Sequence, residues 1–323
     1  MAWDEIIGQD LAKRRLQIHL AAGRVAQAYL LVGPDGVGKR RLAIEMAKAL
    51  TCAASGARPC DECASCRQVS RLTHPDIHVV SPGGSSEQIK IDDIRYLLGR
   101  LVLKPFSAST QVAVIDGAER LTEEAANSLL KSLEEPSSSS RFLLTTARLP
   151  QCLPTVVSRC QMIRCEPLSA EVLRRILIEG QGCDPRMAQT IARLSGGSAS
   201  RAIDLAGRWV VYQNVLEQLA SEGPSWLEQP LPETRQEVTQ LLDGMMAWQR
   251  DVAVAAVADP AQVRHAEHLG ALRRQANAID VDRCLETALE LIDLRESVEQ
   301  FVSPRLIAAL AREKWLSLLC SSP

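Results

Sequence analysis

Apolar runs alternate with amphipathic stretches through the first half of the chain. The runs are short and continuous, as in strands buried on both faces of a parallel sheet, and they lie at residues 28–32, 78–81, 111–115, 141–146 and 161–165. Segments with apolar residues at helical spacing lie before and between them, at 10–22, 39–51, 92–103 and 122–135. This alternation predicts an α/β fold over residues 1–166, with helices on both faces of a parallel sheet.

Polar residues and a proline mark where two of these helices are expected to begin and end. Thr122 is a favourable N-cap, and the two glutamates that follow it suit the positive end of the helix dipole. Asp92 is the expected cap of the preceding helix. That helix should stop ahead of Pro105, because the residue before a proline avoids the helical region.

From residue 169 onward the pattern is helical only. Ser169, Asp184 and the turn at 196–198 each precede a short amphipathic segment, which predicts a three-helix lid over residues 167–207. Longer amphipathic stretches follow, and we expect them to form an all-α domain over 208–323; they lie at 209–221, 232–258, 260–276 and 281–319. The proline-containing segment 221–233 is expected to be a loop in that domain, and 137–140 a loop tip.

Composition and charge exclude few kinds of protein. The 323 residues are 46% hydrophobic and carry a net charge of −2, so nothing marks the whole chain as a nucleic-acid binder. A DNA contact would come from a local basic patch, for which Arg95, Arg100 and Lys104 are candidates, although a solvated helix face is the simpler explanation. No apolar run is long enough to span a membrane, and the first residues do not resemble a signal peptide, so we expect a cytoplasmic protein.

A phosphate-binding loop follows the first predicted strand, in the segment LLVGPDGVGKRR at 30–41. Gly33, Gly36 and Gly38 would let backbone N–H groups close around phosphate oxygens, and Lys39 would add a positive charge. Arg40 stands where a serine or threonine hydroxyl would hold Mg²⁺, and a guanidinium cannot ligate a metal ion. The sequence therefore predicts a phosphate cradle that lacks one magnesium ligand.

A second departure from an active NTPase lies at the end of the strand at 111–115. Asp116 has the place of the carboxylate that organises the metal ion in such enzymes, although a turn residue or helix cap is the ordinary explanation for it alone. Gly117 stands where a glutamate would orient the attacking water, and Glu119 is expected to point elsewhere. Two losses in one site argue against hydrolysis.

Four of the ten cysteines form a cluster with metal-ligand spacing: Cys52, Cys60, Cys63 and Cys66. Two successive Cys-x-x-Cys units can bring three thiolates to one tetrahedral ion, and the upstream cysteine would complete a four-sulfur set. Iron–sulfur clusters use similar spacing, but nothing else indicates electron transfer, so zinc is the preferred metal. A four-cysteine set leaves no open position, and its role is therefore expected to be structural.

Several segments together resemble the clamp-loader branch of the AAA+ family, and within it the delta-prime type of bacterial DNA polymerase III. The resemblance covers residues 3–207 and rests on the cysteine module and on IIGQDLAKRRL at 6–16, QAYLLVGPDGVGK at 27–39, AANSLLKSLEEP at 125–136 and FLLTTARLPQCLPTVVSRC at 142–160. The remainder is similar mainly in being helical, with FVSPRLIAALA at 301–311 like the final helix of the family's collar.

The resemblance implies a role for several residues. Lys39 would be the phosphate lysine and Asp116 the carboxylate on the metal side, Thr145 or Thr146 the first sensor and Arg201 the second. Arg159 would be an arginine finger that acts in trans on the ATP of a neighbouring subunit. Without the resemblance, Arg159 would be read as a surface or salt-bridge arginine and Arg201 as a helix-face cation.

The expected protein is thus a P-loop AAA+ domain with a zinc module, a helical lid and a helical collar. It would be a stator that does not hydrolyse ATP, in a hetero-pentamer with gamma/tau motor subunits and the delta subunit, and would help to load the sliding clamp on primed DNA. One alternative is an ATP-hydrolysing gamma/tau-type motor. Another is a standalone zinc-containing nucleic-acid-binding protein, against which the net charge of −2 and the closed metal site count.

Overall fold

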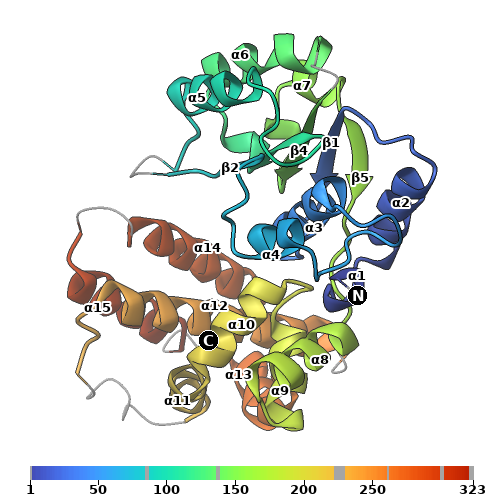
Figure 1. The fold of residues 1–323 in the computed structure, drawn as a ribbon. Coiled ribbons are helices and arrows are strands. Elements are labelled where there is room, and N and C mark those ends of the chain that lie inside the picture. The colour runs from blue at the N-terminus through green and yellow to red at the C-terminus, as the bar shows by residue number, and fades with distance from the viewer. Residues whose placement is uncertain are drawn as a thin grey trace. The chain divides into compact units, whose positions relative to one another are not determined.

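The computed structural model describes residues 2–83, 87–135, 139–221, 230–259, 262–298 and 302–319 (Figure 1). These residues form two compact units. The first contains Met1–Gly182 and Ser195–Ala202, and the second contains Cys183–Leu194 and Ile203–Pro323. The three-part division at residues 166 and 207 remains a prediction.

A five-stranded parallel sheet forms the centre of the described part of the first unit. Its order is β2-β3-β4-β1-β5, and its strands are Ile77–Val80, Gln111–Asp116, Ser140–Thr146, Ala28–Val32 and Gln161–Arg164 in that order. The three inner strands are buried along almost their whole length, which explains why their sequences are continuous apolar runs. The predicted α/β architecture is confirmed.

Helices cover both faces of this sheet (Figure 1). On one face, α2 (Asp10–Ala21) and α3 (Lys39–Thr51) pack through Leu16, Leu42 and Met46 against strand residues such as Tyr29. On the other face, α5 (Ile91–Leu101) and α6 (Glu123–Glu134) bury their apolar stripes against the alternate strand residues, among them Leu30 and Leu144. The shorter elements of the unit are α1 (Ala2–Glu5), α4 (Ala64–Ser70), η1 (Ala118–Arg120), η2 (Leu149–Gln151), α7 (Pro154–Val157) and α8 (Ala170–Gln181).

The helix caps agree with the sequence in two places and differ in one. The side chains of Thr122 and Ser169 each accept a hydrogen bond from the backbone N–H three residues further on, as N-caps do. Asp92 was wrongly predicted as the cap of α5, which begins at Ile91 with Lys90 as N-cap, while Asp93 accepts the Lys90 N–H at 2.9 Å. Pro136 and part of the predicted loop tip at 137–140 lie outside the described residues.

The described residues of the second unit are helical and contain no strand. Its elements are α9 (Pro185–Leu194), α11 (Trp209–Ala220), α12 (Arg235–Val257), η5 (Ala266–His268), α13 (Leu269–Ala278), α14 (Val281–Ser297) and α15 (Pro304–Leu319), while α10 (Ala199–Gly207) crosses the border between the units. The amphipathic stretch at 281–319 holds two helices, because Pro304 opens a new one. Residues 222–229 of the predicted loop at 221–233 lie outside the described part. So do residues 260–261, at the start of the predicted helical stretch 260–276, and Phe301, the first residue of the segment 301–311.

A buried polar group ties the loop before η5 to α12. Asp251 and His265 are fully buried, and the Asp251 carboxylate accepts the backbone N–H groups of Arg264 and His265 at 2.9 and 2.8 Å. The His265 ring lies between Asp251 and the Tyr212 hydroxyl, at 2.8 and 2.9 Å. Burial opposes ionisation of Asp251, but the hydrogen bonds from His265 outweigh it and lower the pKa of this carboxyl group.

Among the described residues, every helix is either too short or too polar to cross a bilayer.

Asp76, just before β2, fixes the loop between α5 and β3. Its carboxylate is buried and accepts the backbone N–H groups of Phe106, Ser107 and Ala108 at 2.5, 2.7 and 2.8 Å, and the Ser107 hydroxyl at 3.1 Å. Burial alone would raise the pKa of Asp76, but these donors lower it below its ordinary value. The loop that enters β3 is therefore held by one ionised side chain.

We predict that Asp76→Asn destabilises the first unit by about 2–3 kcal/mol at pH 7, because an amide turns N–H donors toward the backbone donors that the carboxylate accepts. Urea unfolding followed by circular dichroism would measure this. A carboxylate with a lowered pKa contributes its full stability above the ordinary Asp pKa of about 3.9, so the difference should shrink as the pH falls below that value. The exposed Asp92→Asn variant is the matched control and should change stability by less than about 0.5 kcal/mol. Equal stability of Asp76→Asn and wild type at pH 7 would contradict the assignment.

Candidate functional site

The phosphate-binding loop lies at the carboxyl edge of the sheet. It leaves β1 after Val32, which pairs with Thr146, and Thr145 pairs in turn with Asp116 at the end of β3. Parallel strands bring their carboxyl ends to the same edge, so the loop, the threonines and the aspartate are neighbours there. The strand–loop–helix arrangement matches the sequence prediction, because α3 begins at Lys39 directly after the loop.

Two of the loop glycines are required by close backbone contacts. A Cβ atom on Gly33 would lie 2.1 Å from the carbonyl oxygen of Cys165. Gly36 has a φ of +73°, and a Cβ there would lie 2.2 Å from the Ser198 hydroxyl oxygen. The carbonyl of Gly36 accepts the N–H groups of Ala199 and Ser200 at 2.8 and 3.2 Å. The tip of the loop is thus held against the start of α10.

Lys39 lies over the loop and is almost completely buried, with 8% of its surface exposed. Its ammonium group donates hydrogen bonds to the carbonyl oxygens of Gly33 and Pro34 at 2.7 and 2.6 Å. Burial lowers the pKa of Lys39, and the nearby carboxylates of Asp35 and Glu119 partly oppose that shift. Two of its three N–H groups are used by the loop, which leaves one for a ligand.

Arg40 pairs with the aspartate that would organise a metal ion. Its Nε atom lies 3.7 Å from Oδ2 of Asp116, and half of the Arg40 side chain is exposed. The other carboxylate oxygen, Oδ1, accepts the Thr145 hydroxyl at 2.6 Å, and that hydroxyl accepts the N–H of Gly117 at 3.0 Å. Both oxygens of Asp116 are therefore engaged by the protein. These residues do not fit a magnesium site, since one ligand is missing and a cation faces the other.

The backbone after Asp116 has a conformation that disfavours a glutamate there. Gly117 has a φ of +90°, a conformation that side chains with a Cβ rarely adopt, so a glutamate would be strained there. Glu119 returns to the same edge, contrary to the expectation that it points elsewhere. Its Oε1 atom accepts the N–H of Ala147 at 3.0 Å, and its buried Oε2 atom has no hydrogen-bond partner among the described residues.

Gln9 is a site residue that the sequence analysis did not single out. Its side-chain amide donates to the carbonyls of Val37 and Glu166 at 3.1 and 2.7 Å, and its oxygen accepts the Glu166 N–H at 3.0 Å. It thereby joins the loop to the segment after β5. The sequence signal that could have pointed to Gln9 is its place in IIGQDLAKRRL at 6–16, a segment that resembles the clamp-loader family.

The other candidate residues occupy different surroundings. Thr146 turns its hydroxyl to the Arg148 N–H and the Cys152 thiol, so of the two threonines only Thr145 contacts Asp116. Arg201 is exposed, and its guanidinium has no ion pair in the described part of the chain. The structure brings Gly33, Gly36, Gly38, Lys39, Asp116 and Thr145 to one edge.

Arg159 lies at the surface after α7 and is held by three contacts. Its guanidinium donates to the carbonyl of Thr155 at 2.9 Å and to the Ser158 hydroxyl at 3.4 Å, and it pairs with the carboxylate of Glu134 at the end of α6. One third of the Arg159 side chain is exposed. A partner outside this chain could reach it.

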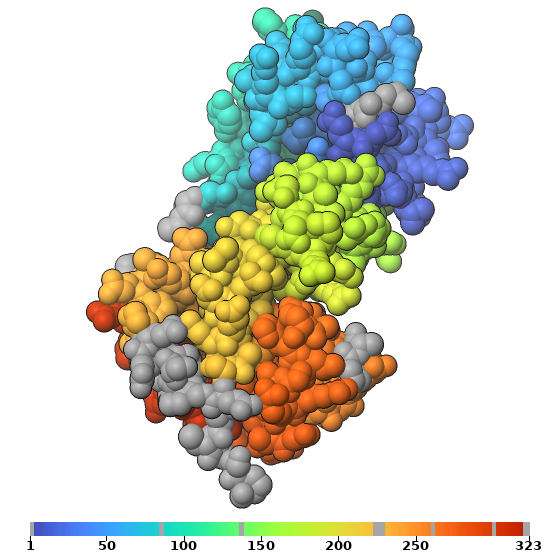
Figure 2. All heavy atoms as spheres, turned by 90° about the horizontal axis from the view of Figure 1, so that it is seen from below, coloured from blue at the N-terminus to red at the C-terminus, as the bar shows by residue number. Residues whose placement is uncertain are grey.

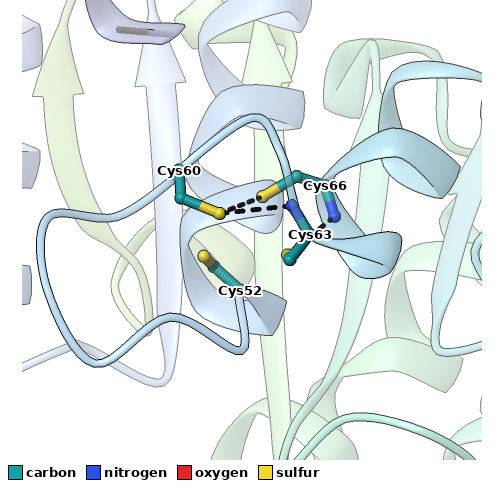
Figure 3. A group of neighbouring side chains, drawn as sticks. All are labelled: Cys52, Cys60, Cys63 and Cys66. Atoms are coloured by element: carbon teal, nitrogen blue, oxygen red, sulfur yellow. Dashed lines mark hydrogen bonds between the residues drawn. The ribbon is translucent and has the colours of Figure 1, made fainter.

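The four cysteines converge on one point, as predicted (Figure 3). Cys52 follows α3, Cys60 lies in the loop after it, and Cys63 and Cys66 flank the start of α4. Their sulfur atoms all lie within 4.8 Å of one another, and those of Cys60 and Cys66 are 3.9 Å apart. Sulfur atoms around a tetrahedral zinc ion are about 3.8 Å apart for bonds of about 2.3 Å. The cluster can therefore hold a metal ion.

Backbone N–H groups point at three of the sulfur atoms and favour the thiolate form of Cys60 and Cys63, whereas burial raises the pKa of Cys66. Ala54, Cys63 and Cys66 donate to the sulfurs of Cys52, Cys60 and Cys63 at 3.5, 3.4 and 3.4 Å. Burial opposes ionisation of Cys63, but the N–H groups of Cys66 and Ala53 help lower its pKa to about 6. Hydrogen bonds from the backbone also lower the pKa of Cys60. Thiolates are the form that binds metal ions.

The cysteine loop is fastened to the end of α3. Lys48, which is buried, pairs with Glu45 on the same helix at 3.1 Å and with Asp61 of the loop at 2.5 Å. Ser65 donates its hydroxyl to the carbonyl of Thr51 at 2.8 Å. The rest of the segment is largely exposed, and the light-blue atoms of this region lie at the molecular surface in Figure 2.

Several known proteins similar to this chain are subunits of bacterial DNA polymerase III or related to one. A solved structure of a DNA polymerase III gamma subunit-related protein from Thermotoga maritima has a TM-score of 0.48 at 18% identity, covering 93% of this chain and 99% of its own. The DNA polymerase III subunit tau of Escherichia coli is 34% identical over 208 residues, which are 62% of this chain and 32% of tau.

Delta' subunits match over a larger part of their own length. The delta' subunit of Pseudomonas aeruginosa is 35% identical over 246 residues, 71% of this chain and 72% of the relative. That of Bacillus subtilis is 36% identical over 209 residues, 64% of this chain and 62% of the relative. The family model described as DNA polymerase III, delta subunit, matches residues 8–169, half of the chain. The chain therefore belongs to the delta' family of DNA polymerase III subunits.

Proposed function

We propose that this chain is a stator of the DNA polymerase III clamp loader, which does not hydrolyse ATP itself and supplies Arg159 to the ATP of a neighbouring subunit. The observation that carries the proposal is the contact between Arg40 and Asp116. A P-loop enzyme needs a metal ion between the loop hydroxyl and this carboxylate. Here the half-exposed guanidinium of Arg40 faces the carboxylate instead.

This chain lacks groups needed to hydrolyse its own ATP but keeps Arg159, which would act on the ATP of a neighbouring subunit. The chain has no glutamate after Asp116, and the conformation of Gly117 disfavours one. Arg159, in contrast, is at the surface, and its partner Glu134 is about half exposed, so a neighbour's phosphate can compete for the guanidinium. Thr145, Arg201 and the loop residues would then be parts of a nucleotide site that no longer turns over.

The proposal includes an AAA+ architecture with a lid over 167–207, an oligomerising collar over 208–323 and a structural zinc ion on the four cysteines. The parallel sheet, the loop at its carboxyl edge and the helical second unit support the architecture. The sulfur–sulfur distances and the all-cysteine set support zinc. Membership in the delta' family supports gamma/tau and delta partners in a cytoplasmic hetero-pentamer that acts on the sliding clamp and primed DNA. The exposed Arg95, Arg100 and Lys104 are candidates for contacts with DNA phosphates.

An ATP-hydrolysing motor is the second candidate function. The similarity to subunit tau of Escherichia coli favours it. The engaged carboxylate of Asp116 and the missing hydroxyl count against it.

We predict that Arg159→Ala leaves the ring intact but removes catalysis at the neighbouring ATP site. An arginine finger contributes about 10³–10⁵ in kcat at the site it serves. In a loader reconstituted with motor and delta subunits, the ATPase rate stimulated by clamp and DNA should fall sharply, while size-exclusion chromatography shows the same assembly. Arg164→Ala, an exposed arginine on β5, is the matched control and should retain the wild-type rate. Unchanged turnover in Arg159→Ala would remove the trans-acting role.

We also predict one tightly bound zinc ion per chain, measured by elemental analysis of protein purified without added metal. Cys63→Ser and Cys66→Ser should each lose the ion and expose the loop between α3 and α4 to proteolysis, because the metal joins its two ends. Cys183→Ser, which alters a buried cysteine outside the cluster, should keep the ion. Iron with inorganic sulfide in place of zinc would contradict this assignment.

A further inference from the structure

We propose that the phosphate-binding loop binds the polyphosphate chain of a nucleotide without Mg²⁺, and that the guanidinium of Arg40 takes the place of the metal ion. This inference rests on the proposed function in one respect, namely that the site holds a ligand and does not hydrolyse it. The ligand class is a metal-free nucleoside di- or triphosphate.

The backbone of the loop remains able to bind an anion. Its carbonyl groups are used by the protein: Gly33 and Pro34 accept from Lys39, Gly36 from the start of α10, and Val37 from Gln9. The N–H groups of residues 36–40, in contrast, meet no acceptor among the described residues. Free N–H groups at the start of a helix of this length, α3, form an anion site. The carbonyl groups thus hold the loop to the rest of the protein, while its N–H groups remain available to a phosphate.

Buried Lys39 is the second, independent feature that points to an anionic ligand. The residue is 8% exposed, and its ammonium group is hydrogen-bonded only to neutral carbonyl oxygens, with no ion pair in the described chain. A buried cation with no directly bonded carboxylate is costly, and the lowered pKa of Lys39 reflects this. A phosphate oxygen at the third N–H would supply the missing negative charge.

Arg40 is suited to the position that a metal ion would occupy. It follows Lys39 in the first turn of α3, and its Nε atom faces Asp116 at 3.7 Å, as Mg²⁺ would face that carboxylate. The two terminal nitrogens of its guanidinium make no hydrogen bond within the described residues, and half of the side chain is exposed. A guanidinium can give two parallel hydrogen bonds to phosphate oxygens, which suits it to bridge Asp116 and a polyphosphate.

The same arrangement opposes binding of the Mg²⁺ complex. Arg40 already faces the charge of Asp116, so a divalent ion at this place would meet a positive charge. The carboxylate oxygen that does not face Arg40 accepts the Thr145 hydroxyl. Magnesium demands near-octahedral oxygen ligands, and the loop offers it no hydroxyl. Magnesium should therefore compete with the protein for the ligand and should not assist its binding.

The test is calorimetric titration of the full chain with ATP, once with excess EDTA and once with excess Mg²⁺, and with inorganic tripolyphosphate in EDTA. The expected result is saturable binding of ATP in EDTA that Mg²⁺ leaves unchanged or weakens. Arg40→Thr should weaken binding in EDTA about tenfold or more, since a charge-assisted contact is lost, and should make Mg²⁺ strengthen binding. The proposal assigns the contacts to the phosphate chain. Tripolyphosphate is therefore expected to bind in EDTA as well, and binding as tight as that of ATP would support the proposal.

Two variants complete the design. Arg41→Thr removes the same charge from the next, exposed position of α3 and should change either affinity by less than about threefold. Lys39→Ala should abolish binding under both conditions. Binding of wild type only in the presence of Mg²⁺, no saturable binding in EDTA, or equal losses in Arg40→Thr and Arg41→Thr would overturn the proposal. Failure here leaves the Arg159→Ala result in the reconstituted loader unaffected, so the two proposals can fail separately.

Discussion

The pairing of Arg40 with Asp116 at the carboxyl edge of the sheet constrains what the phosphate-binding loop can do. The pair is partly exposed, and its 3.7 Å separation exceeds a hydrogen bond, so it contributes at most about 1 kcal/mol to stability. Its importance is chemical. It occupies the carboxylate around which a P-loop enzyme assembles its metal ion, and the Thr145 hydroxyl engages the other oxygen. The fold keeps the geometry of an NTPase while the side chains remove one of its components.

The rest of the first unit keeps that edge in place. Gln9, the start of α10 and Lys39 hold the loop by its carbonyls, and the buried sheet fixes the ends of β1, β3 and β4. The cysteine module is fastened to the far end of α3, away from the loop that begins this helix. Arg159 follows α7 and makes no hydrogen bond or ion pair to the loop among the described residues, so the proposed trans role and an inactive site on this chain are compatible in one domain.

Much of this could be predicted from the sequence, for physical reasons. Buried strands and amphipathic helices leave periodic patterns, a four-cysteine set has few uses, and the loss of a hydroxyl at Arg40 is visible in the sequence. Contacts between residues far apart in the sequence, and the exact conformation of single turns, could not be predicted. The contacts of Gln9 join residues 157 positions apart, and the return of Glu119 to the edge depends on the turn at Gly117. The cap of α5 was placed wrongly, because Asp93 reaches back to Lys90 while Asp92 points to solvent.

The central claim is that this chain lends a cation to catalysis elsewhere and does no cleavage of its own. It is tested most directly by following release of the γ-phosphate from ATP with the isolated full chain in excess over nucleotide, in the presence of Mg²⁺. The account predicts a rate no higher than that of ATP in buffer. Cleavage by the isolated chain at a rate typical of working ATPases, about 1 s⁻¹ or faster, would contradict it.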